Sequence, residues 1–206
     1  IDAHLLNREG VTRLCYCGPV LHTRPASLTG TREPLQFGAE IFGHAGLEAD
    51  LEAAELALDG LTAASLGPLV IDLGHAAVLR GVLAGVPMDA AALQAVVTAL
   101  TEKDGAALRE LTASMPASAR EGLLALLRLY GGEEVLAEAR RVLPASAQVQ
   151  RALDELGWLA QHLRGVVPDV RIGFDLSDMS GYAYYSGARF AIYGARSSDE
   201  IGRAHV

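Results

Sequence analysis

The stretch Thr12–Gly43 reads TRLCYCGPVLHTRPASLTGTREPLQFGAEIFG, and it decides how we interpret the rest of the chain. Two segments in it, Arg13–His22 and Leu35–Phe42, are apolar or alternate between apolar and polar residues, as β-strands do. Between them lies a loop, residues 23–32, that is rich in Pro, Ser, Thr and Gly. The simplest arrangement of two such strands is a long antiparallel hairpin.

The second strand is predicted to have a polar face. Gln36, Gly38 and Glu40 are two residues apart, so they share one face of the strand, and the apolar residues between them share the other. Two hydrogen-bonding side chains beside a glycine suit the floor of a small-molecule site. The solvated face of an ordinary antiparallel strand explains the same pattern, so both interpretations stay open.

The hairpin resembles motif 2 of class II aminoacyl-tRNA synthetases, specifically the histidyl type, through Arg24–Pro25 in the loop and the segment Gln36–Gly43. In that family an arginine at the start of the loop clamps the α-phosphate of ATP. Leu21 stands at the matching position here, and leucine offers a phosphate neither charge nor forked donors. The resemblance therefore includes the loss of a residue that adenylate formation needs.

A second segment, Asp175–Phe190, resembles the histidine-specific segment of the same enzymes. Tyr184 and Tyr185 match its paired tyrosines, whereas Ser180 stands in place of an arginine that assists activation. This combination is similar to the histidyl-tRNA synthetase paralogues that regulate ATP phosphoribosyltransferase, the first enzyme of histidine biosynthesis. The resemblance covers roughly residues 11–78 and 168–196.

Composition limits the partners that we expect. The chain has 206 residues, is 50% hydrophobic and carries a formal net charge of −8, without a run of basic residues. Nucleic acid is therefore not an expected partner, because phosphate binding needs clustered Lys and Arg. No apolar run approaches the roughly 20 residues of a membrane span, and no signal peptide is visible, so we expect no membrane partner and a cytoplasmic protein.

Cysteines and histidines do not suggest a metal site. Cys15 and Cys17 are the only cysteines, and they share one strand face, which favours two reduced residues in or near the core over a disulfide. The six histidines are scattered without a paired spacing. His75 follows a predicted strand and is interpreted as a lone polar group at the start of a helix.

Beyond the hairpin, the pattern predicts an amphipathic helix from Leu47 to Leu61 and a buried strand, Pro68–Gly74. Residues 76–164 then read almost entirely as helix, interrupted at Pro and Gly residues, with Asp89 as an N-cap. Trp158 and His162 are four residues apart on the last helix and are expected to pack together. Two further strands are predicted, Val170–Asp175 and Tyr184–Tyr193.

These elements and the resemblance predict an α+β fold, with a class II aminoacyl-tRNA synthetase-like antiparallel sheet flanked by helices and a helical insertion. Residues 1–78 are expected to form the first part of the synthetase-like core, 79–164 the helical insertion, and 165–206 the second part of the core. The chain is expected to be a portion of a longer protein, because the family's first and third motifs are not seen.

The resemblance implies a non-catalytic regulatory subunit that is required for the activity of short-form ATP phosphoribosyltransferase and for its inhibition by L-histidine. The implied assembly is a homodimer within a hetero-oligomer that contains the short-form catalytic subunit. The residues implied to bind histidine are Gln36, Glu40, Tyr184 and Tyr185. Glu40 would accept a hydrogen bond from the imidazole, Gln36 would bond the α-amino group, and a tyrosine would complete the ring contact. No catalytic residue, metal ion or cofactor is expected.

Two other functions remain open from the sequence. One is a histidyl-tRNA synthetase fragment that activates histidine and charges tRNA, and the other is a free-standing histidine-binding module with an unrelated partner. Within the regulatory interpretation, histidine has two alternative locations, the old synthetase pocket or a subunit interface.

Overall fold

The computed structural model describes residues 9–23, 31–194 and 200–205. It divides into two compact units, residues 1–53 and 54–206, and the boundary falls within helix α2 (Leu47–Ala63). Arg24 and Pro25 of the motif 2 resemblance lie outside the described residues. The predicted division into a core of residues 1–78 and 165–206 with an insertion at 79–164 stays a prediction.

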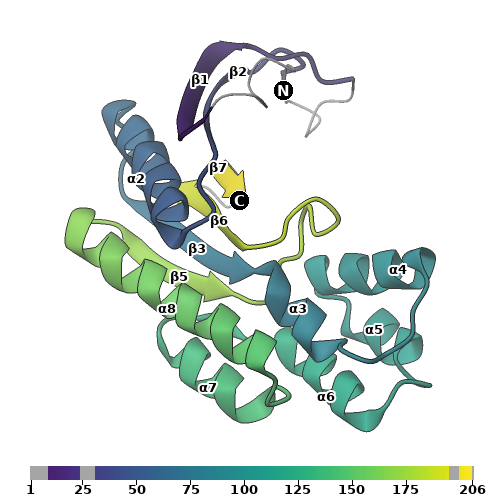
Figure 1. The fold of residues 1–206 in the computed structure, drawn as a ribbon. Coiled ribbons are helices and arrows are strands. Elements are labelled where there is room, and N and C mark those ends of the chain that lie inside the picture. Colours follow the sequence, from purple (N-terminus) through teal and green to yellow (C-terminus); the bar gives the residue numbers. More distant parts are fainter. Residues whose placement is uncertain (1–8, 24–30, 195–199, 206) are drawn as a thin grey trace. The chain divides into compact units, whose positions relative to one another are not determined.

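The first unit is built on the predicted hairpin. Strands β1 (Thr12–Pro19) and β2 (Leu35–Phe42) pair antiparallel (Figure 1). In their register, Tyr16 lies opposite Gly38. Arg13 of β1 forms a two-pronged ion pair with Glu52 of α2, in which Nη2 lies 2.7 Å from Oε2. Cys15 and Cys17 are free thiols as predicted, but both are exposed, so the prediction that they lie in or near the core was wrong.

The second unit contains a five-stranded sheet in the order β4-β5-β3-β6-β7. Figure 1 labels β5, β3, β6 and β7 of this sheet. Its strands are β4 (Tyr130–Gly131), β5 (Arg171–Asp175), β3 (Leu69–His75), β6 (Ala188–Gly194) and β7 (Glu200–His205). Three pairs are antiparallel, as expected, but β3 and β5 are parallel. A parallel pair needs a long crossover connection, which the intervening helices supply.

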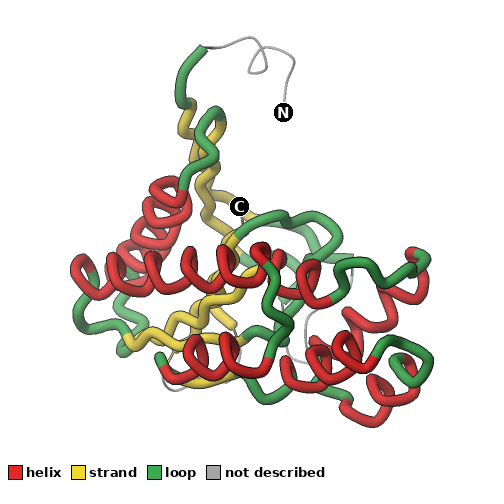
Figure 2. Tube along the Cα trace, turned by 60° about the horizontal axis from the view of Figure 1, so that its bottom comes forward, coloured by secondary structure: helices red, strands yellow, loops and turns green. Residues whose placement is uncertain are grey.

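One face of this sheet is apolar and packs against helix α8 (Ala147–Val166), which lies along the strands in Figure 2. The pairing places Ile71, Ile172 and Ile192 side by side, and the next row contains Leu73 and Phe174. Ile71, Leu73 and Phe174 are almost fully buried. Burial of each such side chain stabilises the fold by about 1.5–3 kcal/mol. The opposite face is polar and carries Asp72, Asp175 and Arg189.

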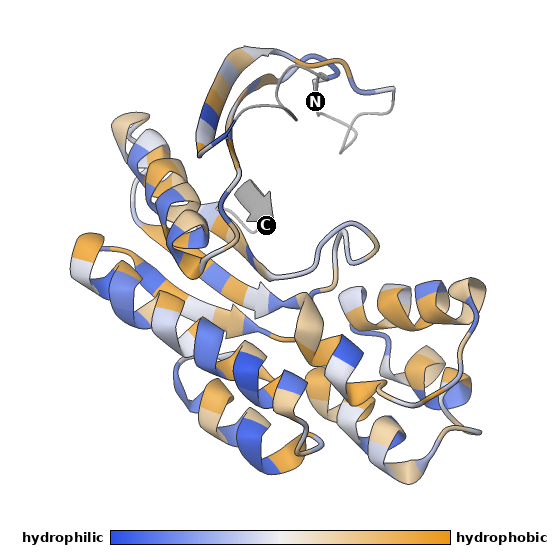
Figure 3. Cartoon of the chain, in the orientation of Figure 1, coloured by the Kyte–Doolittle hydropathy of each residue, from blue (hydrophilic) through white to orange (hydrophobic). Residues whose placement is uncertain are grey.

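The helices between β3 and β5 largely confirm the predicted pattern; they are α3 (Ala76–Val82), α4 (Ala90–Thr101), α5 (Gly105–Leu111), α6 (Ala117–Leu126), α7 (Glu134–Val142) and α8. Asp89 caps α4, accepting a hydrogen bond from the Ala92 N–H at 2.7 Å. Apolar and polar residues alternate around these helices in Figure 3, as expected of helices packed on one side. The short strand at Tyr130 was not predicted. Within the described ranges, no helix is both long and apolar enough to cross a membrane.

Helix α8 contains the predicted aromatic pair. The rings of Trp158 and His162 are stacked, with centroids 3.8 Å apart. The Nδ1 atom of His162 lies 2.8 Å from the carbonyl oxygen of Trp158, one helical turn earlier. The pairing therefore confirms the structural interpretation of these two residues.

His75 connects β3, α3 and α8. Its side chain is 3% exposed, its Nδ1 accepts a hydrogen bond from the Ala77 N–H at 3.1 Å, and its Nε2 lies 2.7 Å from Glu155 Oε2. This geometry requires a neutral imidazole protonated on Nε2, because a proton on Nδ1 would abolish the cap of α3. Burial lowers the pKa of His75, and the attraction of Glu155 only partly opposes this.

We predict that His75→Ala lowers the free energy of unfolding by about 2 kcal/mol at pH 7.5, through loss of the helix cap and of the bond to Glu155. Because the folded pKa is lowered, the contribution of His75 is fully present above its unfolded pKa of about 6.5 and declines below it. Urea unfolding between pH 5 and 7.5 measures both effects. If His75→Ala lowered the free energy of unfolding by the same amount at pH 5 and at pH 7.5, the neutral state of His75 would be contradicted.

Candidate functional site

The predicted polar face of β2 is present. Gln36, Gly38 and Glu40 share one face of the hairpin, and Tyr16 lies on the same face because it is paired with Gly38. The Tyr16 ring covers Gly38, since a Cβ added there would lie 2.5 Å from the ring. The amide Nε2 of Gln36 donates a hydrogen bond to the Tyr16 hydroxyl at 2.6 Å. The glycine therefore makes room for a tyrosine that orients Gln36.

Sequence reasoning missed this role of Tyr16. The signal was available once the register was known, because a large aromatic residue directly opposite a glycine is a complementary cross-strand pair. The register depends on the length and conformation of the connecting loop, which the sequence pattern did not determine.

Tyr184 and Tyr185 do not lie in a strand. Strand β6 begins at Ala188, so the predicted strand Tyr184–Tyr193 was wrong over its first four residues. Gly181 has a φ of +74° and belongs to two successive turns, in which the Tyr182 N–H is bonded to the Met179 carbonyl and the Tyr184 N–H to the Gly181 carbonyl. These turns override the preference of tyrosine for strands.

The two tyrosine rings contact each other in the turn. Their centroids are 5.2 Å apart at an interplanar angle of 80°, the edge-to-face arrangement that aromatic pairs prefer. Tyr184 is 87% exposed, whereas Tyr185 is half-buried. Of the predicted histidine-binding residues, the structure thus brings Gln36 and Glu40 together in the first unit and the two tyrosines together in the second. A site containing all four stays a prediction.

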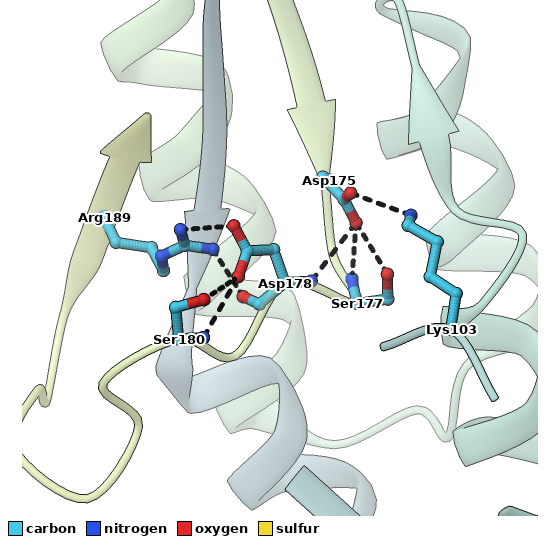
Figure 4. A network of polar contacts seen from close by, with 6 residues as sticks. All are labelled: Lys103, Asp175, Ser177, Asp178, Ser180 and Arg189. Atoms are coloured by element: carbon cyan, nitrogen blue, oxygen red, sulfur yellow. Dashed lines mark hydrogen bonds and ion pairs between the residues drawn. The ribbon is translucent and has the colours of Figure 1, made fainter. Parts of the chain in front are cut away.

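The turn that carries the tyrosines begins at a buried ion pair (Figure 4). Arg189 of β6 is 5% exposed, and its Nη2 and Nη1 atoms each lie 2.5 Å from Asp178, from the carboxylate Oδ2 and the main-chain oxygen respectively. Ser180 donates to Asp178 Oδ1 from its N–H at 3.0 Å and its hydroxyl at 2.8 Å. Burial opposes the charged form of Asp178, but Arg189 and Ser180 outweigh it, and the pKa is lowered.

A second aspartate repeats this arrangement three residues earlier (Figure 4). Asp175 Oδ1 accepts hydrogen bonds from the Ser177 N–H at 2.9 Å and the Ser177 hydroxyl at 2.8 Å. Its Oδ2 lies 2.8 Å from Lys103 Nζ, and that ammonium also lies over the Tyr130 ring. The repeated Asp-x-Ser pattern is a recognisable turn signal that sequence reasoning missed.

Asp72 lies beside these groups on the polar face of the sheet, where its Oδ1 covers Gly173. Burial raises the pKa of Asp72, and the negative charge of Asp175 adds to the effect. An acid with a raised folded pKa destabilises the fold once it is ionised, so its contribution is unfavourable at neutral pH.

We therefore predict that Asp72→Asn leaves the protein equally stable, or more stable by about 0.5–1 kcal/mol, at pH 7.5. The gain in stability of Asp72→Asn over wild type should become smaller as the pH falls, because protonation removes the charge from the wild-type carboxyl. Thermal unfolding of both proteins at pH 7.5 and pH 4.5 provides the comparison. A loss of more than about 1 kcal/mol in Asp72→Asn would show that the carboxylate makes a stabilising contact.

Comparison of the sequence with models of protein families identifies the family of this chain. The profile described as histidyl-tRNA synthetase matches residues 1–204. The chain belongs to this family. This result confirms the family that the hairpin and the paired tyrosines resemble.

Within the histidyl-tRNA synthetase family, the chain is similar to proteins named ATP phosphoribosyltransferase regulatory subunit. The relative from Albidiferax ferrireducens is 52% identical over 203 residues, which cover 98% of this chain and 52% of the relative. The relative from Variovorax paradoxus is 56% identical over 204 residues, with 98% and 53% covered. The chain thus spans about half the length of the curated relatives that it matches.

Solved structures of the family confirm the predicted fold class. A Bacillus halodurans C protein, described as an ATP phosphoribosyltransferase regulatory subunit/histidyl-tRNA synthetase, aligns with a TM-score of 0.81 and 27% identity, over 98% of this chain and 52% of its own. A chain of the ATP phosphoribosyl transferase (HisG:HisZ) complex from Thermotoga maritima aligns with a TM-score of 0.74 over 98% of this chain and 70% of its own. Its identity is 19%, so this likeness concerns the fold alone.

Proposed function

We propose that the full-length protein is a non-catalytic regulatory subunit of ATP phosphoribosyltransferase, required by the short-form catalytic subunit and for inhibition by L-histidine. The observation that supports this most strongly is the identity of 52–56% with relatives that carry that name. The subunit would act in the first step of histidine biosynthesis, in the cytoplasm, as a homodimer within a hetero-oligomer. The helical segment 79–164 would be an insertion into its synthetase-like core.

The two substitutions in the synthetase motifs support the absence of catalysis. Leu21, which stands where the family places its phosphate-binding arginine, is 76% exposed and has no charge to offer. Ser180, at the position of the second arginine, directs its hydroxyl to Asp178 at 2.8 Å. Neither residue can stabilise the developing charge of an adenylation transition state, which depends on cationic donors.

The geometry of the hairpin supports histidine as the ligand of this subunit. Because Nε2 of Gln36 donates to Tyr16, the amide oxygen of Gln36 is the atom left to accept a hydrogen bond from a ligand ammonium. Glu40 lies four residues along the same face and would accept the imidazole N–H. Tyr184 or Tyr185 would complete the ring contact, and each tyrosine hydroxyl is able to donate or accept.

Association and adenylation assays together test the proposed function. The full-length protein and a short-form catalytic subunit from the same organism should co-elute in size-exclusion chromatography with light scattering, at a mass above that of either alone. The full-length protein should show no histidine-dependent ATP–pyrophosphate exchange. Exchange activity without complex formation would instead identify a histidyl-tRNA synthetase.

A further inference from the structure

Helix α3 donates hydrogen bonds to three consecutive main-chain carbonyl groups of the turn that carries the two tyrosines. Arg80 Nη1 donates to the Tyr185 oxygen at 3.2 Å, and Arg80 Nη2 donates to the Ser186 oxygen. The N–H of Ala76, the first residue of α3, donates to the Gly187 oxygen at 3.1 Å. One guanidinium and one main-chain N–H from the same short helix therefore hold the backbone that follows the tyrosine pair.

Helix α3 is itself a rigid support. Val78 and Leu79 are fully buried, and His75 caps the helix while it bonds Glu155 of α8. Arg80 is half-buried, and its guanidinium reaches from this helix to the Tyr185 and Ser186 carbonyl oxygens. The guanidinium presents its donors in a fixed planar fork, and this geometry matches two neighbouring carbonyl groups.

The opposite end of the turn is fixed as well, by the ion pair of Asp178 with Arg189. Between these two anchors, the Tyr185 ring lies against the backbone at Gly181, where an added Cβ would come within 2.0 Å of the ring. The position of this ring thus depends on where the Tyr185 backbone is held. Tyr184, which contacts that ring edge to face, depends on it in turn.

We propose that Arg80 is a positioning residue for the effector: it holds the Tyr185 and Ser186 carbonyls so that the Tyr184–Tyr185 ring pair is ordered before histidine binds. This inference rests on the proposed function and names the support of its effector site. A ligand that meets an ordered ring pair does not have to immobilise it, so removal of the support should weaken binding. We expect about a tenfold rise in the histidine concentration for half-inhibition.

The test uses the full-length protein in complex with its catalytic subunit. Arg80→Gln removes the charge and the fork, and Arg80→Lys retains a single point donor. Arg109→Gln is the matched control, because Arg109 Nη1 also donates to a carbonyl, that of Gly105 at 3.1 Å, but within its own helix. The readouts are amide hydrogen exchange over residues 182–187, the histidine concentration for half-inhibition, and phosphoribosyl transfer without histidine.

Arg80→Gln should speed exchange over residues 182–187 and raise the half-inhibition concentration about tenfold, with histidine-free transfer and thermal stability close to wild type. Arg80→Lys should give an exchange rate and a half-inhibition concentration between those of wild type and Arg80→Gln. Arg109→Gln should match wild type in both. Unchanged exchange and inhibition in Arg80→Gln, while Tyr184→Ala weakens inhibition, would overturn this inference and leave the proposed function intact. A wild-type complex that histidine does not inhibit would overturn the proposed function and, with it, the effector role of Arg80.

Discussion

Asp178→Asn should lower the free energy of unfolding by about 3 kcal/mol, because it leaves the guanidinium of Arg189 buried without its counter-charge. Arg189 is 5% exposed and donates to both the carboxylate and the carbonyl of Asp178, so only part of its bonding survives the substitution. The pKa of Asp178 is lowered in the folded state. Its contribution is therefore present above the unfolded pKa of about 4 and is lost as the pH falls through the folded value.

Urea unfolding at pH 7 and at decreasing pH measures this effect. The difference in the free energy of unfolding between wild type and Asp178→Asn should become smaller as the wild-type carboxyl becomes protonated. Lys103→Met is the control, because the Lys103–Asp175 pair is more exposed and its loss should cost less than about 1 kcal/mol. Equal losses of unfolding free energy in Asp178→Asn and Lys103→Met would contradict the claim that the buried Asp178–Arg189 pair contributes more to stability than the exposed pair.

Glu40→Gln in the full-length protein should weaken histidine binding about 10- to 100-fold, because a hydrogen bond to a charged group contributes about 1.5–3 kcal/mol. Gln36→Ala should weaken it about tenfold, since it removes both the acceptor for the ligand ammonium and the bond to Tyr16. Isothermal titration calorimetry with L-histidine measures both changes.

Glu33→Gln provides the control for these substitutions, because Glu33 is exposed in the same hairpin but precedes strand β2. Its affinity for histidine should equal that of wild type. Unchanged affinity in both Glu40→Gln and Gln36→Ala would exclude the old synthetase pocket. Histidine binding would then have to be assigned to a subunit interface.

Local sequence signals predicted most of the elements in this fold. The alternation on β2 defined the face shared by Gln36 and Glu40, and Asp89 marked the start of α4 by its capping side chain. These signals act over a few residues, so the sequence alone is sufficient to locate them. The stacked pair Trp158 and His162 was predictable for the same reason, because helical spacing brings residues four apart together.

Tertiary context explains the features that were not predicted. Tyr184 and Tyr185 favour a strand by propensity, but the turns around Gly181 and the contacts from Arg80 keep them outside β6. The parallel pairing of β3 with β5 joins segments separated by six helices, and no local pattern specifies it. Strand β7, which pairs with β6, lies beyond the last strand that the sequence pattern predicted, and it was missed.

The residues of the candidate site show the same difference between local sequence signals and tertiary contacts. Gln36, Glu40 and the two tyrosines were predicted from the resemblance to known motifs, whereas the contacts of Tyr16 and Arg80 became visible only in the structure. Both act across long sequence separations, on a glutamine twenty residues away and on a turn more than a hundred residues away. Supporting residues of this kind leave no local signature.

The measurement that tests the central claim most directly is phosphoribosyl-ATP formation from ATP and phosphoribosyl pyrophosphate by a short-form catalytic subunit of the same organism. The reaction is run with and without the full-length protein and is then titrated with L-histidine. The regulatory function predicts that the protein activates the reaction and that histidine reverses the activation. A catalytic subunit whose rate is the same with and without the protein would contradict it.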